Sequence, residues 1–259
     1  MGHFPKFTVL HIPHDSTDIP CSIRDQFSLN DAELAHEITA MTDWHTQEAF
    51  LGSQTDVVFV RSDVSRLVVD VERFINDDEE IMSRIGMGAV YMSTSNGLPL
   101  RRPLSTAERQ DLLDTYYFPH HARFEAAVDK MLSLHQQCLI IDCHSFPSKP
   151  LPYESHQESG RPQICIGSDP FHTPQTLISK LLRTFQQAGF TVKENYPFAG
   201  SIVPLKHYHI DKRVISFMVE IRRDLYIDES NGRKKSDFEH TMHRIRNCCQ
   251  QAIAALNEV

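Results

Sequence analysis

Short apolar segments alternate with helical segments along nearly the whole chain of 259 residues. Several of the apolar segments are continuous rather than interrupted by polar residues, which is typical of strands covered on both faces. We expect strands at Phe7–Ile12, Val57–Arg61, Leu67–Val71, Leu139–Asp142, Gln163–Gly167, Thr191–Glu194 and Ile215–Ile221. This alternation predicts an α/β fold in which a mixed, mostly parallel sheet is flanked by helices on both faces.

The expected helices lie between these strands. Ser105 and Glu108 form a capping box, so we expect a long helix from Ser105 toward Gln136, with a break or kink near Pro119. No repeat, low-complexity stretch or linker divides the sequence, and we therefore expect a single domain over residues 1–259. The other expected helices are Asp31–Thr39, Asp43–Leu51, Pro174–Ala188 and Asp237–Leu256.

Composition and charge argue against several classes of protein. The formal net charge of -8, from 26 Lys+Arg against 34 Asp+Glu, does not suit a nucleic-acid partner. No apolar run is long enough to span a bilayer, and the N-terminal segment lacks a signal-peptide pattern, so we expect no membrane partner. The six cysteines include no C-x-x-C pair, which favours reduced thiols and a cytoplasmic location. The 15 histidines hint at metal or proton chemistry.

The expected strand ends indicate which histidines matter. Ligands of open α/β sheets bind beyond the carboxyl ends of the strands. The first strand is followed by His14, the fourth runs into Asp142-Cys-His144, and the last carries Glu220. Two histidines and one glutamate are therefore expected near the same edge of the sheet.

These residues suit a catalytic metal site. Zinc in such a site has about three protein ligands and an open position for water. His14 and His144 would supply two ligands, and Asp43 or His45 the third. Glu220 would stay unligated and accept a proton from the metal-bound water. The alternative is that His14 and His144 form only local hydrogen bonds, since no short zincin motif is present.

A charged cluster accompanies the expected strand at 67–71. In an extended strand Arg66, Asp70 and Glu72 would share one face, and Arg73 would lie on the other. Charges in an apolar strand are costly unless they are paired. Arg66 and Arg73 could clamp a carboxylate with their forked donors, or an arginine–aspartate pair here could be purely structural.

Seven motifs in order carry a family resemblance. They are HIPHDSTDIP at 11–20, TDWH at 42–45, SRLVVDVER at 65–73, YFPHH at 117–121, IDCHSF at 141–146, PFAGSIV at 197–203 and EIRRDLY at 220–226. On these motifs the chain resembles the N-formylglutamate amidohydrolase family, a branch of the zinc carboxypeptidase and aspartoacylase-like hydrolases. The resemblance implies a zinc-carboxypeptidase-like (phosphorylase/hydrolase-like) fold. It also implies a metal-dependent hydrolase that cleaves the amide bond of a small acidic acyl-amino acid such as N-formylglutamate.

The same resemblance assigns the metal and proton-transfer roles. It implies His14, Asp43 and His144 as ligands of one divalent ion, for which zinc is the first choice, with His45 in reserve for Asp43. Glu220 matches the glutamate that acts as general base and then as general acid.

The resemblance also indicates substrate contacts. Arg66, Arg73 and Arg222 match basic positions of the family motifs, so that one anchors a substrate carboxylate and another polarises the scissile carbonyl. We place Arg66 in the catalytic group and the other two in the substrate-binding group. Tyr91 and His121 are further candidates for substrate contact, although His121 equally suits a surface position at the start of a helix.

The chain departs from the commoner family pattern around the expected substrate pocket. Asp15-Ser16 follows His14 where P-H-S-G is usual, Glu72 stands at the asparagine of D-L-N-R, and Gly200-Ser201 replaces a pair of glycines. None of these changes removes an expected ligand or Glu220. Two alternatives therefore stay open: a carboxypeptidase-like hydrolase of another acyl-amino acid or a small peptide, and a non-catalytic binding protein that retains the fold.

Overall fold

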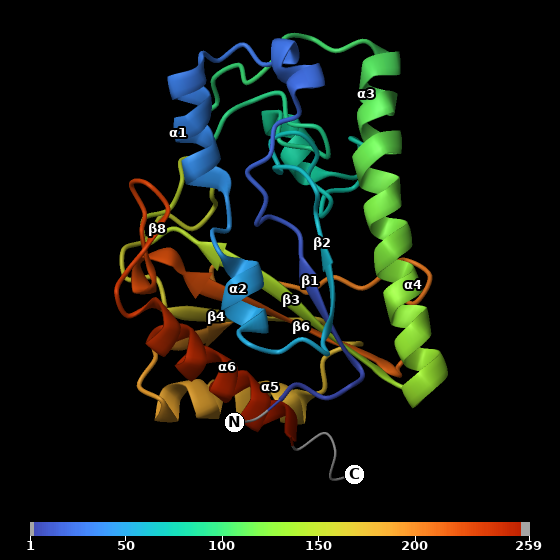
Figure 1. Cartoon of the computed structure of the whole chain (residues 1–259), viewed down its shortest axis with the longest axis vertical. Coiled ribbons are helices and arrows are strands. Elements are labelled where there is room, and N and C mark those ends of the chain that lie inside the picture. The colour runs from blue at the N-terminus through green and yellow to red at the C-terminus, as the bar shows by residue number, and fades with distance from the viewer. Residues whose placement is uncertain (1–2, 255–259) are drawn as a thin grey trace.

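A six-stranded sheet forms the centre of the molecule in the computed structural model, which describes residues 3–254 (Figure 1). The strand order is β2-β1-β3-β6-β4-β5, in which β2, β1, β3 and β6 are parallel, and β4 and β5 run in the opposite direction. Six of the expected strands and the mixed, mostly parallel sheet are confirmed. The strands are β1 (Thr8–Ile12), β2 (Val58–Arg61), β3 (Cys138–Phe146), β4 (Ile164–Ser168), β5 (Val192–Glu194) and β6 (Val214–Arg222).

The α-helices follow the expected order, with changes at their ends. They are α1 (Asp31–Met41), α2 (Thr46–Leu51), α3 (Thr106–Leu112), α4 (Phe118–His135), α5 (Gln175–Gln187) and α6 (Phe238–Ala254). Short 3-10 turns at Cys21–Gln26, Ile81–Ile85 and Arg223–Leu225 and a small hairpin of β7 (Ile227–Asp228) and β8 (Arg233–Lys234) complete the fold. The last two residues of the helix expected at Asp237–Leu256 lie outside the described residues.

Helices cover both faces of the sheet, as expected (Figure 1). Leu139, Ile141 and Cys143 of β3 pack into a core shared with α2, α5 and α6. Cys138 and Ile140, which alternate with them, pack into a second core under α4. Because successive side chains of a strand point to opposite faces, the residues that continue the second row, Asp142 and His144, lie on the α4 side.

The prediction of a strand at Leu67–Val71 is wrong. This segment forms turns, in which the backbone N–H of Val68 donates to Ser65 O at 2.8 Å and that of Asp70 donates to Ala89 O at 2.8 Å. Its apolar residues all pack into a third core, formed with α1 and with the chain between Met87 and Leu113. A continuous apolar run is equally compatible with a loop buried on all sides, and here the packing decided against a strand.

The long helix begins at the expected capping box, where Glu108 N donates to Ser105 Oγ at 3.2 Å. Its irregularity is a π-helical turn at Leu113–Tyr117, which joins α3 to α4 immediately before Pro119. Proline lacks a backbone N–H and crowds the preceding turn of a helix. The wider π turn accommodates it without ending the helix.

Candidate active site

The carboxyl ends of β1, β3 and β6 bring His14, His144 and Glu220 together, as the sequence predicted. His144 and Glu220 are directly paired across the parallel strands β3 and β6, and His14 follows the end of β1 by two residues. Asp43 N donates to His14 O at 2.9 Å, which holds the loop before α2 against this edge. The cavity here has a volume of about 190 Å³, and its charged lining residues are His14, Asp43, Arg66, Glu72, Arg73, His144, Glu154, Glu220 and Arg223.

Each of the two histidines has a carboxylate on its Nε2 atom. Nε2 of His14 donates to Asp70 Oδ1 at 2.9 Å, and Nε2 of His144 donates to Asp142 Oδ1 at 3.0 Å. The Nδ1 atoms lie 3.6 Å and 3.1 Å from Asp43 Oδ2, and Nδ1 of His14 is buried without a hydrogen bond to any described residue. A carboxylate partner on one ring nitrogen is the usual arrangement of a metal-binding histidine, because it leaves the other nitrogen free for the ion.

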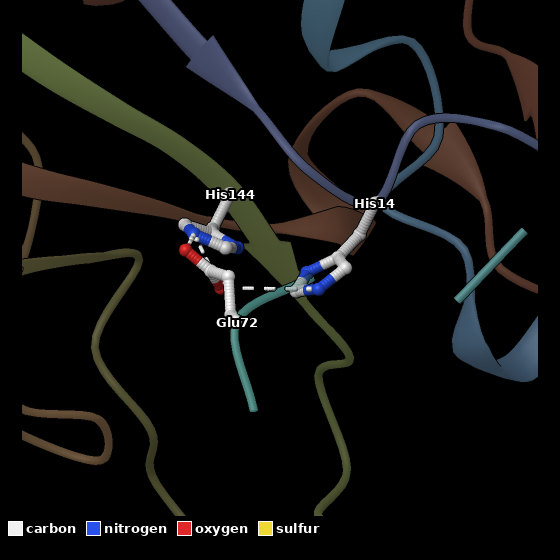
Figure 2. A group of neighbouring side chains, drawn as sticks. All are labelled: His14, Glu72 and His144. Carbon is white, nitrogen blue, oxygen red and sulfur yellow. Dashed lines mark hydrogen bonds and ion pairs between the residues drawn. The ribbon is translucent and has the colours of Figure 1, made fainter. Parts of the chain in front are cut away.

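Glu72 approaches the same histidines from the other side. Its Oε2 atom lies 3.2 Å from Nε2 of His144 and 3.8 Å from Nε2 of His14, so that the carboxylate lies between the two rings (Figure 2). Ligand atoms of His14, Glu72 and His144 lie within 4.8 Å of one another, as do those of His11, Glu72 and Asp142. These groups could hold a metal ion, and Asp43 and Glu72 are both candidates for a carboxylate ligand.

Asp43 is held as a carboxylate. Burial alone would raise its pKa, but the adjacent imidazoles of His14 and His144 and the charge of Arg223 hold the pKa of Asp43 well below its usual range. Nη2 of Arg223 donates to Asp43 Oδ1 at 2.8 Å. This contact leaves Oδ2 directed at the two imidazoles, and a carboxylate in that state is a suitable ligand for a cation.

Glu220 is in the opposite state. Burial raises the pKa of Glu220 to about 8, and its Oε2 atom has no hydrogen-bond partner among the described residues. The residue nevertheless lines the cavity. A carboxyl group whose pKa lies near neutrality and whose oxygen is free in a cavity is suited to proton transfer.

The arginines of the cavity differ in how far their donors are occupied. Arg223 donates hydrogen bonds to Ser145, Ala40 and Asp43. Arg66 donates to Asp70 Oδ2 through Nε at 3.2 Å and through Nη2 at 2.7 Å. Nε of Arg73 lies 3.7 Å from Asp70 Oδ2, and no hydrogen bond joins its guanidinium to residues 3–254. Among the described residues of the cavity, Arg73 is therefore the arginine whose whole guanidinium is available for a ligand, whereas Arg66 has only Nη1 left.

Comparison with known proteins identifies the family. A model of the N-formylglutamate amidohydrolase family matches residues 7–227. The chain belongs to this family. The N-formylglutamate amidohydrolase from Ralstonia eutropha JMP134 shares its fold, with a TM-score of 0.83 and 20% identity over 98% of this chain and 95% of that one. Gene product Atu2144 from Agrobacterium tumefaciens is similar, with a TM-score of 0.72 and 19% identity over 97% and 92% of the two chains.

Membership of the N-formylglutamate amidohydrolase family confirms the resemblance and supports hydrolysis of an amide bond in a small molecule. At about one residue in five identical, the two structures show the fold alone. No curated protein matches the sequence significantly. None of the helices formed by residues 3–254 is long and apolar enough to cross a membrane.

Four candidates from the sequence lie outside the cavity of this amidohydrolase-family chain. Arg222 donates to Asp224 Oδ1 at 2.7 Å and to Arg161 O at 2.6 Å, and His45 donates to Gly232 O at 2.9 Å. Tyr91 is fully buried behind the site, where its hydroxyl donates to Asp70 Oδ2 at 2.6 Å.

His121 is the fourth of these candidates. It donates to Val71 O at 2.8 Å and lines neighbouring cavities. The positions of Arg222 and Tyr91 therefore do not support direct contact with substrate, whereas contact of His121 stays a prediction, because it lines a cavity that also contains Glu72 and Arg73.

Two residues of the site were not singled out from the sequence. Arg223 takes the place expected for Arg222, because β6 ends at Arg222 and a 3-10 turn follows, so the alternation of a strand no longer applies. Asp142 precedes His144 by two residues in β3 and shares its face. The period of two along a strand is the signal that could have identified Asp142.

Proposed function

We propose that this chain hydrolyses the amide bond of a small N-acyl amino acid, such as an N-formyl amino acid, with the help of one divalent metal ion. The observation that carries the proposal is the arrangement of His14, His144 and Asp43 beside Glu220. Both histidines have their Nε2 atoms on carboxylates and their Nδ1 atoms toward Asp43. Histidine and aspartate donors suit zinc, which is our first choice of metal.

Asp43 is the third ligand in this proposal. Asp70 and Asp142 hold the Nε2 atoms of the two histidines, and Asp43 faces both Nδ1 atoms, so an ion that displaced the protons there would meet the Nδ1 lone pairs and the Asp43 carboxylate together. Glu72 contacts His14 and His144 at Nε2, the nitrogens that Asp70 and Asp142 already hold. A divalent ion held there would supply Lewis acidity to a water and to the scissile carbonyl.

The protein groups around it carry the rest of the reaction. Glu220 accepts a proton from the attacking water and delivers it to the departing amine, which requires a carboxyl with a pKa near neutrality and a free oxygen. Arg66 uses Nε and Nη2 on Asp70, which leaves Nη1 to stabilise the oxyanion that develops on the carbonyl. Arg73, with its donors free, anchors the substrate carboxylate.

Release of free amine from a panel of N-acyl amino acids tests the function, with and without a chelator. We expect hydrolysis that is lost with the chelator and restored by zinc. The Glu220→Gln variant should retain its metal and lose about 10²–10⁴-fold in kcat. Glu158→Gln, at an exposed glutamate outside the cavity, is the matched control. Unchanged hydrolysis in a fully metal-loaded Glu220→Gln variant contradicts the role of Glu220.

Metal content of two further variants tests the ligand set. Asp43→Asn should lose most of its metal affinity, whereas Glu72→Gln should retain its metal, measured by titration against a competing chelator. The reverse result makes Glu72 the ligand. Purified protein that binds no divalent ion and hydrolyses nothing after addition of zinc would instead support the non-catalytic binding protein.

A further inference from the structure

Glu72 and Arg73 are neighbours in the sequence, and both side chains reach the catalytic cavity. Their opposite charges do not form an ion pair with each other. Both line the cavity of about 190 Å³. Both also line an adjoining cavity of about 210 Å³, together with Tyr117, Ile202 and Val203. A substrate that extends from the catalytic centre in this direction must pass both side chains.

The other charges of the cavity are already neutralised by protein groups. Asp70 pairs with Arg66 at 2.7 Å and only more distantly with Arg73, at 3.7 Å, and Asp43 pairs with Arg223. Glu154 is held by Arg161, which lies behind the cavity wall. Once these pairs are set aside, Arg73 is the cation available to a ligand, and it can neutralise one carboxylate.

Glu72 is an anion with unused acceptors. Both of its oxygens contact Nε2 of His144, at 3.2 and 3.3 Å, but Asp142 takes the same nitrogen at 3.0 Å. One ring N–H cannot satisfy two carboxylates. The side chain of Glu72 is 17% exposed, and the cavity is where its remaining lone pairs can be used.

We propose that Glu72 and Arg73 select substrates that carry one carboxylate for Arg73 and, beyond it, an uncharged N–H donor or a cation for Glu72. A second carboxylate in a cavity of this size would lie close to Glu72, and like charges in a partly buried site repel strongly. This inference rests on the proposed amidohydrolase function and narrows its substrate. N-formylglutamine should be a better substrate than N-formylglutamate.

The two compounds make a matched pair, because they have nearly the same size. They differ only in the side-chain group, which is a carboxamide in N-formylglutamine and a carboxylate in N-formylglutamate. We expect the zinc-loaded protein to prefer N-formylglutamine by at least about tenfold in kcat/KM, given the cost of one uncompensated charge pair. Glu72→Gln should reduce this preference to about threefold or less, and Glu72→Asn should do the same if the glutamine variant folds poorly. Glu158→Gln should leave the preference unchanged.

Two further measurements separate this inference from the proposed function. Calorimetric binding of both compounds to the zinc-loaded Glu220→Gln variant reports the selectivity without hydrolysis, and zinc content is measured for every variant. A preference for N-formylglutamate in both assays, or an unchanged preference in both Glu72 variants, overturns the inference alone. Loss of zinc from Glu72→Gln also overturns it, because Glu72 is then a ligand. Binding with the expected selectivity but no hydrolysis by the zinc-loaded protein contradicts only the proposed function, and absence of both contradicts both.

Discussion

Individual carboxyl groups at this site are held in different states by their surroundings. Asp43 is kept ionised by two imidazoles and Arg223. Glu220, which lies on β6, is buried in the cavity wall, and this burial raises its pKa to about 8. Two carboxyls with such different tendencies to ionise are suited to different roles, one as a ligand and one as a proton carrier.

The raised pKa of Glu220 predicts a pH-dependent effect on stability in the metal-free protein. The folded-state pKa is about 8 against an ordinary value of 4.5, so the stability gained from the protonated form is complete below about 4.5 and is lost as the pH rises through 8. Glu220→Gln should therefore be more stable than the wild type by a few kcal/mol at pH 9. Urea denaturation of both proteins at pH 5 and pH 9 measures this difference in the free energy of unfolding. An equal difference at both pH values would show that ionisation of Glu220 is not the cause.

The same group predicts the pH profile of hydrolysis. A general base acts when deprotonated, so kcat/KM should fall as the pH decreases through the pKa of Glu220. A divalent ion in the site favours the ionised form, and the apparent pKa of the acid limb should therefore lie below about 8. Initial rates between pH 5 and pH 9 measure it. A rate that stays constant down to pH 5 contradicts this role.

The free donors of Arg73 predict a defect in substrate binding. Arg73→Met should raise KM by about 10- to 100-fold, the usual effect of removing a charged hydrogen-bond donor, with a smaller change in kcat. Arg73→Lys should recover part of this loss, because it restores the charge without the forked donors. Arg222→Met is the control variant, since Arg222 already donates hydrogen bonds to Asp224 and to Arg161 O. A larger KM effect at Arg222 than at Arg73 would reverse the assignment.

At the scale of elements, the turn segment at 65–73 connects the site to the third core. Its apolar side chains pack into that core, while Asp70 accepts hydrogen bonds from His14, Arg66 and Tyr91. Burial alone would raise the pKa of Asp70, but the charges of Arg66 and His14 hold the pKa well below its usual range. A strand here would have kept half of its side chains out of the core, so the turns serve both the packing and the site.

Asp70→Asn tests this connection. The substitution leaves Arg66 buried without its counter-charge, and we expect a loss of about 3–5 kcal/mol in the free energy of unfolding. Metal affinity should also fall, by about 10- to 100-fold, because the carboxylate that orients His14 is lost. Urea denaturation and metal titration measure the two effects. Asp63→Asn, at an exposed pair with Arg123, should cost less than about 1 kcal/mol.

At the scale of the whole molecule, the sheet brings together segments that are far apart in the chain. His14 follows β1, Asp43 lies between α1 and α2, and His144 lies in β3, next to β6. Because β1, β3 and β6 are parallel neighbours, their carboxyl ends meet at one edge. A metal bound by the three residues would therefore link the loop before α2 to the sheet and stabilise the folded state.

Metal removal should lower the thermal stability of the whole chain. At a free metal concentration of about 100 times the dissociation constant, binding contributes about 2.7 kcal/mol, which corresponds to about 5–10 °C in Tm for a chain of this length. Thermal unfolding with a chelator, and again after addition of zinc, measures the shift. Asp43→Asn should show little response to zinc. A wild-type Tm that is insensitive to both treatments argues against a bound metal.

Much of this protein was determined by its sequence. The short apolar segments predicted six strands of the sheet, and the carboxyl-end rule placed His14, His144 and Glu220 at one edge, where the structure has them. These inferences succeed because the direction of a side chain in a regular strand follows from its position alone. The resemblance carried by the seven motifs added the family, which the match over residues 7–227 confirms.

Tertiary packing decided what lies outside regular elements. The apolar run at 67–71 became a buried turn, which brought Glu72 between the two histidines, and the end of β6 placed Arg223 rather than Arg222 in the cavity. No local period determines the direction of a side chain in a turn or just beyond a strand, since it depends on contacts with residues distant in the sequence. The positions of His14, His144 and Glu220 were therefore predictable from the chain itself, whereas the other charges that line the cavity required the fold.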